Sequence, residues 1–508
     1  MLGRGLPDNL EISGRSALPH GTGVLDAVTM IQQVDVQALD TTRLTEVIGP
    51  ERATKFAASA ATARSLLGGR RVINVNSTAT GGGVAELLQT LLAYVRDLGI
   101  DAQWFVIEGN TEFFAITKRI HNHLYGAGGD GGRLGPDQRV AYEATLAPNA
   151  DELLSVVQPE DIVMLHDPQT AGLVRAMKSA GAHVVWRCHV GRDQPNEFTE
   201  AGWEFLRPYL EDVDAFVFTR DEFAPSWIDR ARLRIITPSI DPLSAKNEPL
   251  TPTRVQSILQ YVGLLDGNSK LGATTYRRRD GSPGRVDRRV DILQTGPPPP
   301  ADAPLVVQVS RWDVMKDMQG VLHAFAEHVD RRFGAHLALV GPNVQGVTDD
   351  PEGGMVLDNC VAAWRALPEI ARARIHLACV PMHDPDEAAI IVNALQRHAA
   401  VVTQKSVAEG FGLTVVEAMW KHRPIVATRV GGIVDQIDDG VHGLLVDDPD
   451  DLPGFADRIN RLLADPAFAE TLGTNAYQRA HRTFLQDSHL ESYAALFASV
   501  LGEETERP

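Results

Sequence analysis

Residues 72–98 read VINVNSTATGGGVAELLQTLLAYVRDL, and they contain the three parts of one α/β unit. The stretch begins with a short apolar run typical of a buried strand and continues with a loop of Thr and Gly. Apolar residues then recur at intervals of three and four, which predicts a helix with one face packed on a sheet. These residues are Val84, Leu87, Leu88, Leu91, Leu92, Val95 and Leu98.

The same order of strand, loop and helix recurs in two series. The apolar runs are short, continuous and rich in Val and Ile, as strands buried on both faces of a parallel sheet are. Their alternation with helices predicts two parallel-sheet α/β domains. We expect further strands at 104–107, 162–165, 183–186, Ala215–Phe218 and 234–236, and then at Leu305–Val309, 336–340, 375–379, 399–403 and 424–428.

These series divide the chain into five segments: a flexible lead (1–35), a first domain (36–265), an insertion or linker (266–303), a second domain (304–485) and a C-terminal helix (486–508). The insertion holds six Arg and a run of four Pro, which is typical of a loop. We favour a solvated insertion over the alternative, an anion-binding patch made by Arg277, Arg278 and Arg279.

Composition narrows the class of protein. The net charge of −18 argues against nucleic acid or an anionic membrane as the main partner, because both need a basic surface. Three scattered Cys exclude a disulfide framework and a Cys-based zinc site. No secretory signal and no run of roughly 18 apolar residues is found, so we expect a soluble, cytoplasmic protein.

Loops that follow strands are where a site is expected, since ligands bind beyond the carboxyl ends of strands in open α/β sheets. After residues 72–76, Gly81, Gly82 and Gly83 open a helix. Glycine lets a ligand approach the backbone, and the helix N-terminus offers unpaired N–H groups. A tight turn explains the same glycines equally well.

Two cations follow the strand at Leu305–Val309. Arg311 and Lys316 lie near a strand end and the next helix start, so they can hold a diphosphate from two sides. The alternative is a pair of surface cations, one of them bound to Asp313 or Asp317.

Residues 406–417 read SVAEGFGLTVVE and follow another predicted strand. Glu409 lies in the loop, and Glu417 lies about one turn inside a helix that starts near Leu413. Backbone N–H groups around Gly412 and Thr414 can hold a phosphate, and ionised carboxylates can accept bonds from paired sugar hydroxyls. Alternatively, Glu417 is an exposed helix residue and Glu409 a charge that favours the helix dipole.

Ionisable side chains also end two strands of the first series. They belong to His166-Asp167-Pro168 and Arg187-Cys188-His189, which lie on the same predicted sheet edge. We interpret them as a second part of the site, against the alternative of satisfied structural residues.

Together these residues resemble a known family. Arg311-x4-Lys316 and Glu409-x7-Glu417, with Gly410-Phe411-Gly412 between, resemble the retaining nucleotide-sugar glycosyltransferases of the GT-B fold, the glycogen-synthase-like and sucrose-synthase-like enzymes. The first half is similar to the glycosyl-transferring trehalose synthases at residues 75–86, 104–110, 113–114, 117–118, 121–122, 166–169, 186–189 and 238–243. The resemblance spans roughly residues 40–490 and gives no role to residues 1–35 or to the insertion.

The resemblance implies two Rossmann-like domains facing a cleft, with the C-terminal helix packed back on the first, acceptor-binding domain. It implies retaining glucosyl transfer from a nucleoside diphosphate glucose, UDP- or ADP-glucose, to free glucose, giving α,α-trehalose. No cofactor and no metal are expected.

Roles carry over by residue. Arg311 and Lys316 would neutralise the diphosphate, Glu409 would hold the transferred glucose, and Glu417 the ribose. His189 would lie beside the anomeric carbon. Further donor contacts are implied for Gly82, Gly83, Gly410, Phe411, Gly412, Leu413 and Thr414, and acceptor contacts for Glu108, Lys118, His121, Asp167 and Arg187.

Other functions stay open. They are a retaining trehalose phosphorylase that uses glucose 1-phosphate, a glycosyltransferase of the same fold with another acceptor, and a non-catalytic regulator that binds nucleotide sugars. The nucleotide base and the oligomeric state, a homodimer included, are open too.

Overall fold

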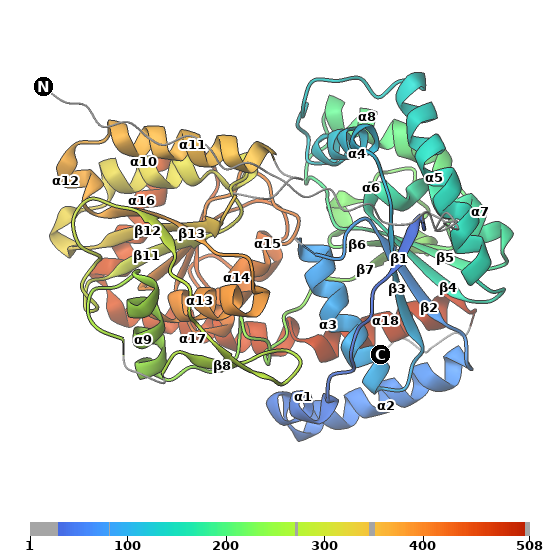
Figure 1. The fold of residues 1–508 in the computed structure, drawn as a ribbon, viewed down its shortest axis with the longest axis horizontal. Coiled ribbons are helices and arrows are strands. Elements are labelled where there is room, and N and C mark those ends of the chain that lie inside the picture. Colours follow the sequence, from blue (N-terminus) through green and yellow to red (C-terminus); the bar gives the residue numbers. More distant parts are fainter. Residues whose placement is uncertain (1–28, 81, 270–272, 345–350, 503–508) are drawn as a thin grey trace, which may run out of the picture.

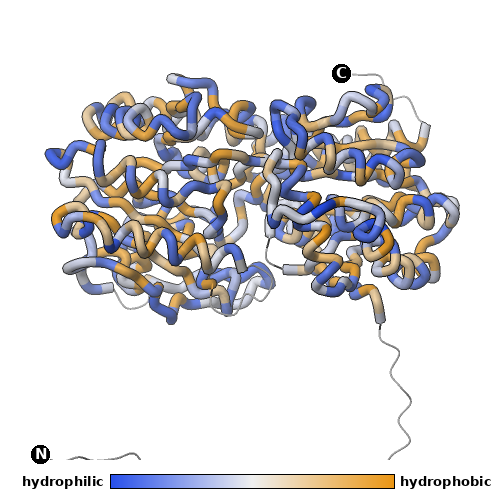
Figure 2. The backbone as a smooth tube through the Cα atoms, turned by 90° about the horizontal axis from the view of Figure 1, so that it is seen from above, coloured by the Kyte–Doolittle hydropathy of each residue, from blue (hydrophilic) through white to orange (hydrophobic). Residues whose placement is uncertain are grey.

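The structure, a computed structural model, describes residues 29–80, 82–269, 273–344 and 351–502. It has two lobes, each built around a seven-stranded sheet that is covered by helices (Figure 1). Figure 2 shows the lobes side by side from above, with hydrophobic stretches running through the interior of each. The predicted α/β class with two parallel-sheet domains is confirmed.

The first sheet has the spatial order β1-β3-β2-β4-β5-β6-β7. All neighbouring strands are parallel except β1, which pairs antiparallel with β3. The predicted strands of the first series are found within two residues of their expected ends. The bounds are β1 Ile31–Gln33, β2 Val72–Asn76, β3 Ala102–Ile107, β4 Ile162–His166, β5 His183–Cys188, β6 Ala215–Phe218 and β7 Leu233–Ile235.

Some helices of the first half begin at a side chain that caps their first turn. The side chain of Asp40 accepts a bond from the Thr42 N–H at the start of α1, and Asn110 does the same for Phe113 at the start of α4. The bounds are α1 Thr41–Ile48, α2 Pro50–Leu67, α3 Gly83–Asp97, α4 Thr111–Leu124, α5 Pro136–Val156, α6 Asp167–Thr170, α7 Val174–Ser179 and α8 Glu197–Leu206.

The second sheet has the order β10-β13-β12-β11-β14-β15-β16, parallel apart from β10. Its strands are β10 Asp291–Leu293, β11 Leu305–Val309, β12 His336–Pro342, β13 Ile375–Val380, β14 Val401–Gln404, β15 Ile425–Thr428 and β16 Leu444–Val446. The remaining helices are α9 Pro252–Val262, α10 Met318–His328, α11 Pro351–Ala366, α12 Glu369–Arg372, α13 Pro385–His398, α14 Leu413–Trp420, α15 Ile433–Gln436, α16 Leu452–Ala464, α17 Pro466–Thr483 and α18 Gln486–Val500.

The predicted flexible lead is wrong at its end. Residues 1–28 lie outside the described residues, but β1 adds an edge strand to the first sheet, with Ile31 opposite Ile107. The side chain of Glu152 on α5 accepts bonds from the Met30 and Ile31 N–H groups. A strand of three residues, two of them Gln, carries no apolar run by which it could be recognised.

The predicted solvated insertion is also wrong in part. Residues 273–303 contain a hairpin, β8 Thr275–Arg277 with β9 Pro283–Arg285, and the edge strand β10. Arg278 pairs with Asp384 at 2.8 Å and Arg288 with Glu387 at 2.6 Å, so the start of α13 neutralises two of the cations. This disagrees with the alternative of an anion-binding patch, since Arg278 is taken up by a carboxylate.

The segment before the insertion belongs by contact to the second lobe. Helix α9 packs against α13, and the Asn393 amide donates to the carbonyl oxygens of Ala245 and Glu248 at 2.9 Å. The predicted boundary at residue 265 therefore differs from where the chain crosses between lobes.

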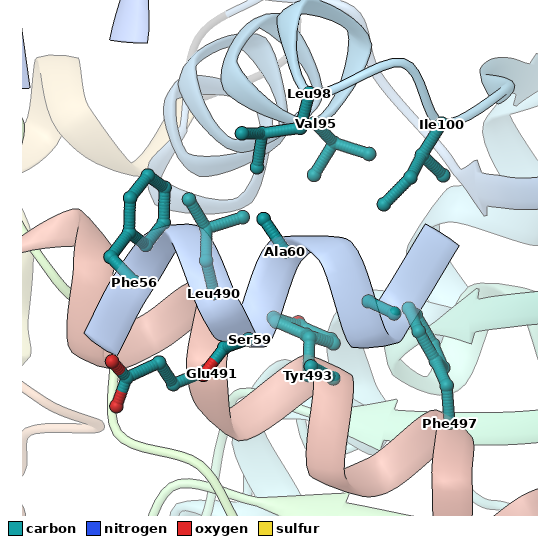
Figure 3. A pocket seen from close by; sticks show the side chains of 12 residues that line it. Phe56, Ser59, Ala60, Val95, Leu98, Ile100, Leu490, Glu491, Tyr493 and Phe497 are labelled. Carbon is teal, nitrogen blue, oxygen red and sulfur yellow. The ribbon is translucent and has the colours of Figure 1, made fainter. Parts of the chain in front are cut away.

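Helix α18 returns to the first lobe and packs on α2 and α3. Figure 3 shows Leu490, Tyr493 and Phe497 of α18 facing Phe56 and Ala60 of α2 around a small apolar cavity. The cavity measures about 30 Å³, which is far too small for a sugar. An ion pair of 2.7 Å between Arg52 and Asp487 closes one end of this contact.

Truncating α18 in the core should destabilise the protein. Leu496 is only 1% exposed, so Leu496→Ala is expected to lower the free energy of unfolding by about 2–5 kcal/mol. Lys55→Ala is the control. Lys55 of α2 pairs with Glu491 of α18, but its side chain is 69% exposed, so this substitution should change the free energy of unfolding little. Urea unfolding of both variants measures this, and equal losses would contradict the assigned docking of α18.

Candidate active site

Loops that follow strands of the two lobes meet at Gly410. A Cβ atom at this position would lie 2.6 Å from the carbonyl oxygen of His189, after β5, and 3.1 Å from the hydroxyl of Tyr125, at the end of α4. No side chain fits there, so Gly lets the two backbones approach. The strand ends selected from the sequence in each half are therefore neighbours.

Lys316 and Glu409 form the most enclosed ion pair at this junction. Lys316 Nζ lies 2.6 Å from Glu409 Oε2, and the two side chains are 15% and 9% exposed. The hydroxyl of Ser406 donates to the same carboxylate oxygen at 3.1 Å. Asp313 caps the turn that carries Lys316 by accepting the Met315 N–H. The structure thus brings together two residues that lie 93 positions apart.

Arg311 lies at the same strand end and is half exposed. Its guanidinium contacts Asp313 at 3.0 Å, which is one of the two partners considered for it from the sequence. Asp317, the other, instead pairs with the buried Lys405. The planar N–H groups of a guanidinium match the oxygens of a phosphate or carboxylate in geometry.

The loop 409–412 leads into α14 through Gly412, whose φ of +89° lies in the left-handed region that favours glycine. Phe411 is buried and packs its ring at 5.7 Å from Phe484, which anchors the loop. Leu413 and Thr414 begin the helix, and the Thr414 hydroxyl donates to Gln404. The first N–H groups of α14 are thereby fixed next to Glu409.

Glu417 is buried, so the alternative of an exposed helix residue is wrong. Its Oε1 lies 3.6 Å from Lys246 Nζ, and the same ammonium lies 2.9 Å from Glu86 on α3. Burial alone would lower the pKa of Lys246, but the charges of Glu417 and Glu86 outweigh it and raise that pKa. Glu417 Oε2 is buried and makes no hydrogen bond within the described chain.

In the first lobe, a buried chain of polar groups ends at His189. Hydrogen bonds join Asn74 Oδ1 to His166 Nε2 at 3.0 Å and His166 Nδ1 to His189 Nε2 at 3.2 Å. The backbone N–H of His189 donates to the Asp167 carboxylate at 2.8 Å. Burial, helped by the charge of Arg187, lowers the pKa of His166 to about 3 and holds that of His189 well below its usual range. Burial raises the pKa of Asp167 to about 7.

The predicted acceptor residues on α4 also face the junction. Lys118 pairs at 3.7 Å with Glu352 on α11 of the other lobe. Burial and the charges of Lys118 and Arg311 lower the pKa of His121 to about 4, so its ring is neutral near pH 7. Glu108 is exposed beyond β3, and Asn149 fixes its backbone.

Arg187 is the exception among the predicted acceptor residues. Its side chain is fully buried, where it donates to the Tyr493 hydroxyl of α18 and to the Ile236 carbonyl at 3.2 Å. The guanidinium is committed to these contacts inside the first lobe, which disagrees with the predicted contact with the acceptor.

Gly82 and Gly83 lie at the start of α3, whereas Gly81 lies outside the described residues. A Cβ atom at Gly82 or Gly83 would meet nothing within 4 Å. The chain's own packing therefore does not demand glycine at these positions, and the space over the loop is open.

Lys246 and Tyr125 lie at the junction but were not selected from the sequence. Lys246 is a single cation in a turn, and Tyr125 ends a helix whose apolar face explains an aromatic residue there. Burial and the charge of Glu409 raise the pKa of the Tyr125 hydroxyl. Neither residue belongs to a local motif, so only the fold reveals that it lies at the site.

Comparison with known proteins identifies the family. Residues 74–225 match the model of the trehalose synthase N-terminal domain, and residues 303–465 match that of the group 1 glycosyl transferases. The trehalose synthase of Pyrococcus horikoshii is 34% identical over 90% of this chain and 95% of its own. The chain belongs to the trehalose synthase family. A more distant relative, the trehalose phosphorylase of Pleurotus pulmonarius, is 25% identical over 77% of this chain and 52% of its own.

Solved structures show the same GT-B fold. An α,α-trehalose-phosphate synthase (UDP-forming) from Burkholderia vietnamiensis has a TM-score of 0.60 at 14% identity, over 85% of this chain and 97% of its own. The Anabaena protein HepE in complex with UDP-glucose has a TM-score of 0.56 at 15% identity, over 84% and 98%. The protein is thus a trehalose-related glycosyltransferase with the GT-B fold.

The described part of the chain contains no group of three or more His, Cys, Asp or Glu placed to hold a metal ion. None of its helices is long and apolar enough to cross a membrane.

The pKa of Asp167 predicts a pH effect on stability. Between about pH 4 and pH 7 the folded state keeps a proton on Asp167 that the unfolded state has lost. Stability contributed by this group therefore falls as the pH rises through that window. Asp167→Asn removes the effect, so its free energy of unfolding relative to the parent should rise from pH 4 to pH 7. Urea unfolding at constant ionic strength measures this, and a flat or falling difference would count against the assignment.

Proposed function

We propose that this protein transfers glucose from a nucleoside diphosphate glucose to free glucose with retention, giving α,α-trehalose. The observation that carries the proposal is the Lys316–Glu409 pair beside Gly410, where both lobes meet. Family membership and the UDP-glucose complex of HepE support a nucleotide-sugar donor.

The donor would lie along the second lobe. Departure of the diphosphate develops negative charge, which Arg311, Lys316 and the first N–H groups of α14 would stabilise. Lys316 would then be shared between the phosphate and Glu409, whose carboxylate accepts bonds from the hydroxyls of the transferred glucose. Gly82 and Gly83 would cover the donor from the first lobe.

Glu417 would hold the ribose. A buried carboxylate oxygen without a hydrogen bond is costly, and two vicinal hydroxyls supply the missing donors. The base would lie near the backbone of Val380, which ends β13, and of Met382.

The anomeric carbon would lie beside the His189 carbonyl oxygen, which already points at the donor loop. Positive charge grows on this carbon as its bond to the phosphate oxygen breaks, and a carbonyl dipole stabilises it. The 1-hydroxyl of the acceptor glucose would attack from the same face and pass its proton to the leaving phosphate. The acceptor would be held by Asp167, His121, Lys118 and Glu108. Arg187 is not assigned a contact with the acceptor, because its side chain is buried in the first lobe.

Substrate identity is tested by a donor-by-acceptor matrix. UDP-glucose and ADP-glucose are each combined with glucose, glucose 6-phosphate or no acceptor, and glucose 1-phosphate serves as a third donor. A non-reducing α,α-linked disaccharide from a nucleotide donor and glucose is expected, identified by NMR of the product. Activity only with glucose 1-phosphate would favour a phosphorylase, and product only with glucose 6-phosphate another acceptor. Binding without turnover would favour a regulator.

Removing the phosphate clamp should impair the chemistry. Lys316→Ala is expected to lower kcat/KM for the nucleotide donor by about 100-fold or more, because one preorganised charge is lost where charge develops. Lys316→Arg keeps the charge and should recover part of the rate. Lys178→Ala is the control, since Lys178 forms an ion pair of 2.8 Å with Asp214 elsewhere in the first lobe. Unaltered turnover in Lys316→Ala would show that the clamp is assigned wrongly.

A further inference from the structure

Arg220 follows β6 in the first lobe and lies at the junction, with its side chain only 7% exposed. Three carboxylates surround it: Asp193 at 2.9 Å, Glu222 at 3.2 Å and Asp435 at 3.0 Å. Asp435 belongs to α15, so the guanidinium joins first-lobe acids to an acid of the second lobe. An enclosed cation with this many partners is held far more firmly than a surface pair.

Arg220 and Asp193 also hold one residue of the other lobe by its backbone. The Arg220 guanidinium donates to the Gly431 carbonyl oxygen, and the Gly431 N–H donates to Asp193 Oδ2 at 3.0 Å. Both polar groups of Gly431 are therefore bound by side chains of the first lobe.

Gly431 in turn presses on the loop that carries Glu409. Its φ is +51°, and a Cβ atom there would lie 1.7 Å from the Glu409 carbonyl oxygen, so no other residue fits. The next N–H, of Gly432, donates to the Gly410 carbonyl at 3.1 Å. Fixing the position of Gly431 therefore also fixes the backbone of residues 409–410.

We propose that Arg220 and Asp193 are positioning residues, which fix the Glu409 loop through Gly431 when the lobes close on the donor. The inference rests on the proposed function, because it assigns Glu409 to the transferred sugar. It gives the first lobe a part in donor recognition that needs no contact with the donor. Closure and the placement of Glu409 become one event, since these bonds exist only while the lobes touch.

The geometry predicts which substitutions are tolerated. The guanidinium spans three carboxylates and a carbonyl with several N–H groups in one plane, whereas an ammonium offers a single point of charge. Arg220→Lys should therefore restore only part of the function, and Arg220→Met none. Asp435→Asn should act on the same step, because Asp435 is the partner from the second lobe.

The test compares binding of the transferred sugar with binding of the nucleotide. In the proposed function Glu409 holds the sugar, whereas Arg311, Lys316 and Glu417 hold the nucleotide, so loss of Arg220 should affect sugar binding far more than nucleotide binding. In Arg220→Met we expect kcat/KM for the nucleotide donor to fall by about 30-fold or more, in line with a catalytic group displaced by a fraction of an ångström. The Kd of UDP or ADP alone, measured by calorimetry, should stay within about twofold of the parent protein.

The control is Arg230→Met, which removes an exposed ion pair with Asp221 in the same lobe. A purely structural role for Arg220 would weaken nucleotide and sugar binding alike, and Arg220→Lys would then restore both together. That result, or an Arg220→Met variant indistinguishable from Arg230→Met, would overturn the inference.

A double-mutant cycle of Arg220→Met and Asp435→Asn gives a second, independent measure. Coupling in kcat/KM is expected if the two residues act through one contact, and additive losses would contradict it. The unmodified protein distinguishes failure of the proposed function: if it forms no disaccharide, the proposed transfer is wrong. In that case the difference between the Kd of the nucleotide sugar and the Kd of the nucleotide alone still tests the role of Arg220.

Discussion

The close approach of two backbones at the junction is the constraint on which the site depends. Gly410 leaves no room for a side chain beside the His189 carbonyl, and Gly431 leaves none beside the Glu409 carbonyl. These contacts place a carbonyl oxygen of one lobe and a carboxylate of the other around a single point. Parallel sheets make this possible, because the loops that follow their strands gather at one edge. A larger residue at Gly410 would push the lobes apart, and one at Gly431 would displace the Glu409 loop within the second lobe.

Local charge, not net charge, decides what this junction can bind. The chain carries −18 overall, yet Lys316 and Lys246 each lie beside a carboxylate predicted to accept sugar hydroxyls. Both pairs are largely enclosed, so most of the desolvation is completed on folding. A ligand would then exchange partners with charges already in place, which is the preorganisation that speeds leaving-group departure. The acidic residues of runs such as 447–451 are solvated and do not enter this balance.

The sequence predicted the central strands of the two sheets better than their edge strands. Strands buried on both faces, such as β2 and β11, are recognised by continuous runs rich in Val and Ile. Loops such as 409–412 are recognised by glycines that precede apolar residues at helical spacing. The edge strands β1 and β10 are three residues each and half polar, so no periodicity distinguishes them from loop. Arg220, Lys246 and Tyr125 are single residues whose partners lie up to 285 positions away, as Gly410 does from Tyr125, so only folding makes them neighbours. For Arg187, the sheet edge indicates that the residue ends a strand but not that its side chain turns into the first lobe, toward Tyr493 and Ile236.

The buried oxygen of Glu417 bears on the choice between the two trehalose chemistries. A phosphorylase takes glucose 1-phosphate, which has no ribose, so that substrate brings no ribose diol to the buried oxygen. Leaving such a group unpaired costs on the order of 1–3 kcal/mol, and more for a charged one. A nucleoside diphosphate sugar brings two hydroxyls on one ring face, matched to the two oxygens of a carboxylate. Lys246 Nζ lies 3.6 Å from Glu417 and 2.9 Å from Glu86 on α3, so it ties the Glu417 carboxylate to the helix behind Gly82 and Gly83. In the proposed function the ribose would thus lie where the first lobe is expected to cover the donor, which would link nucleotide recognition to closure of the lobes.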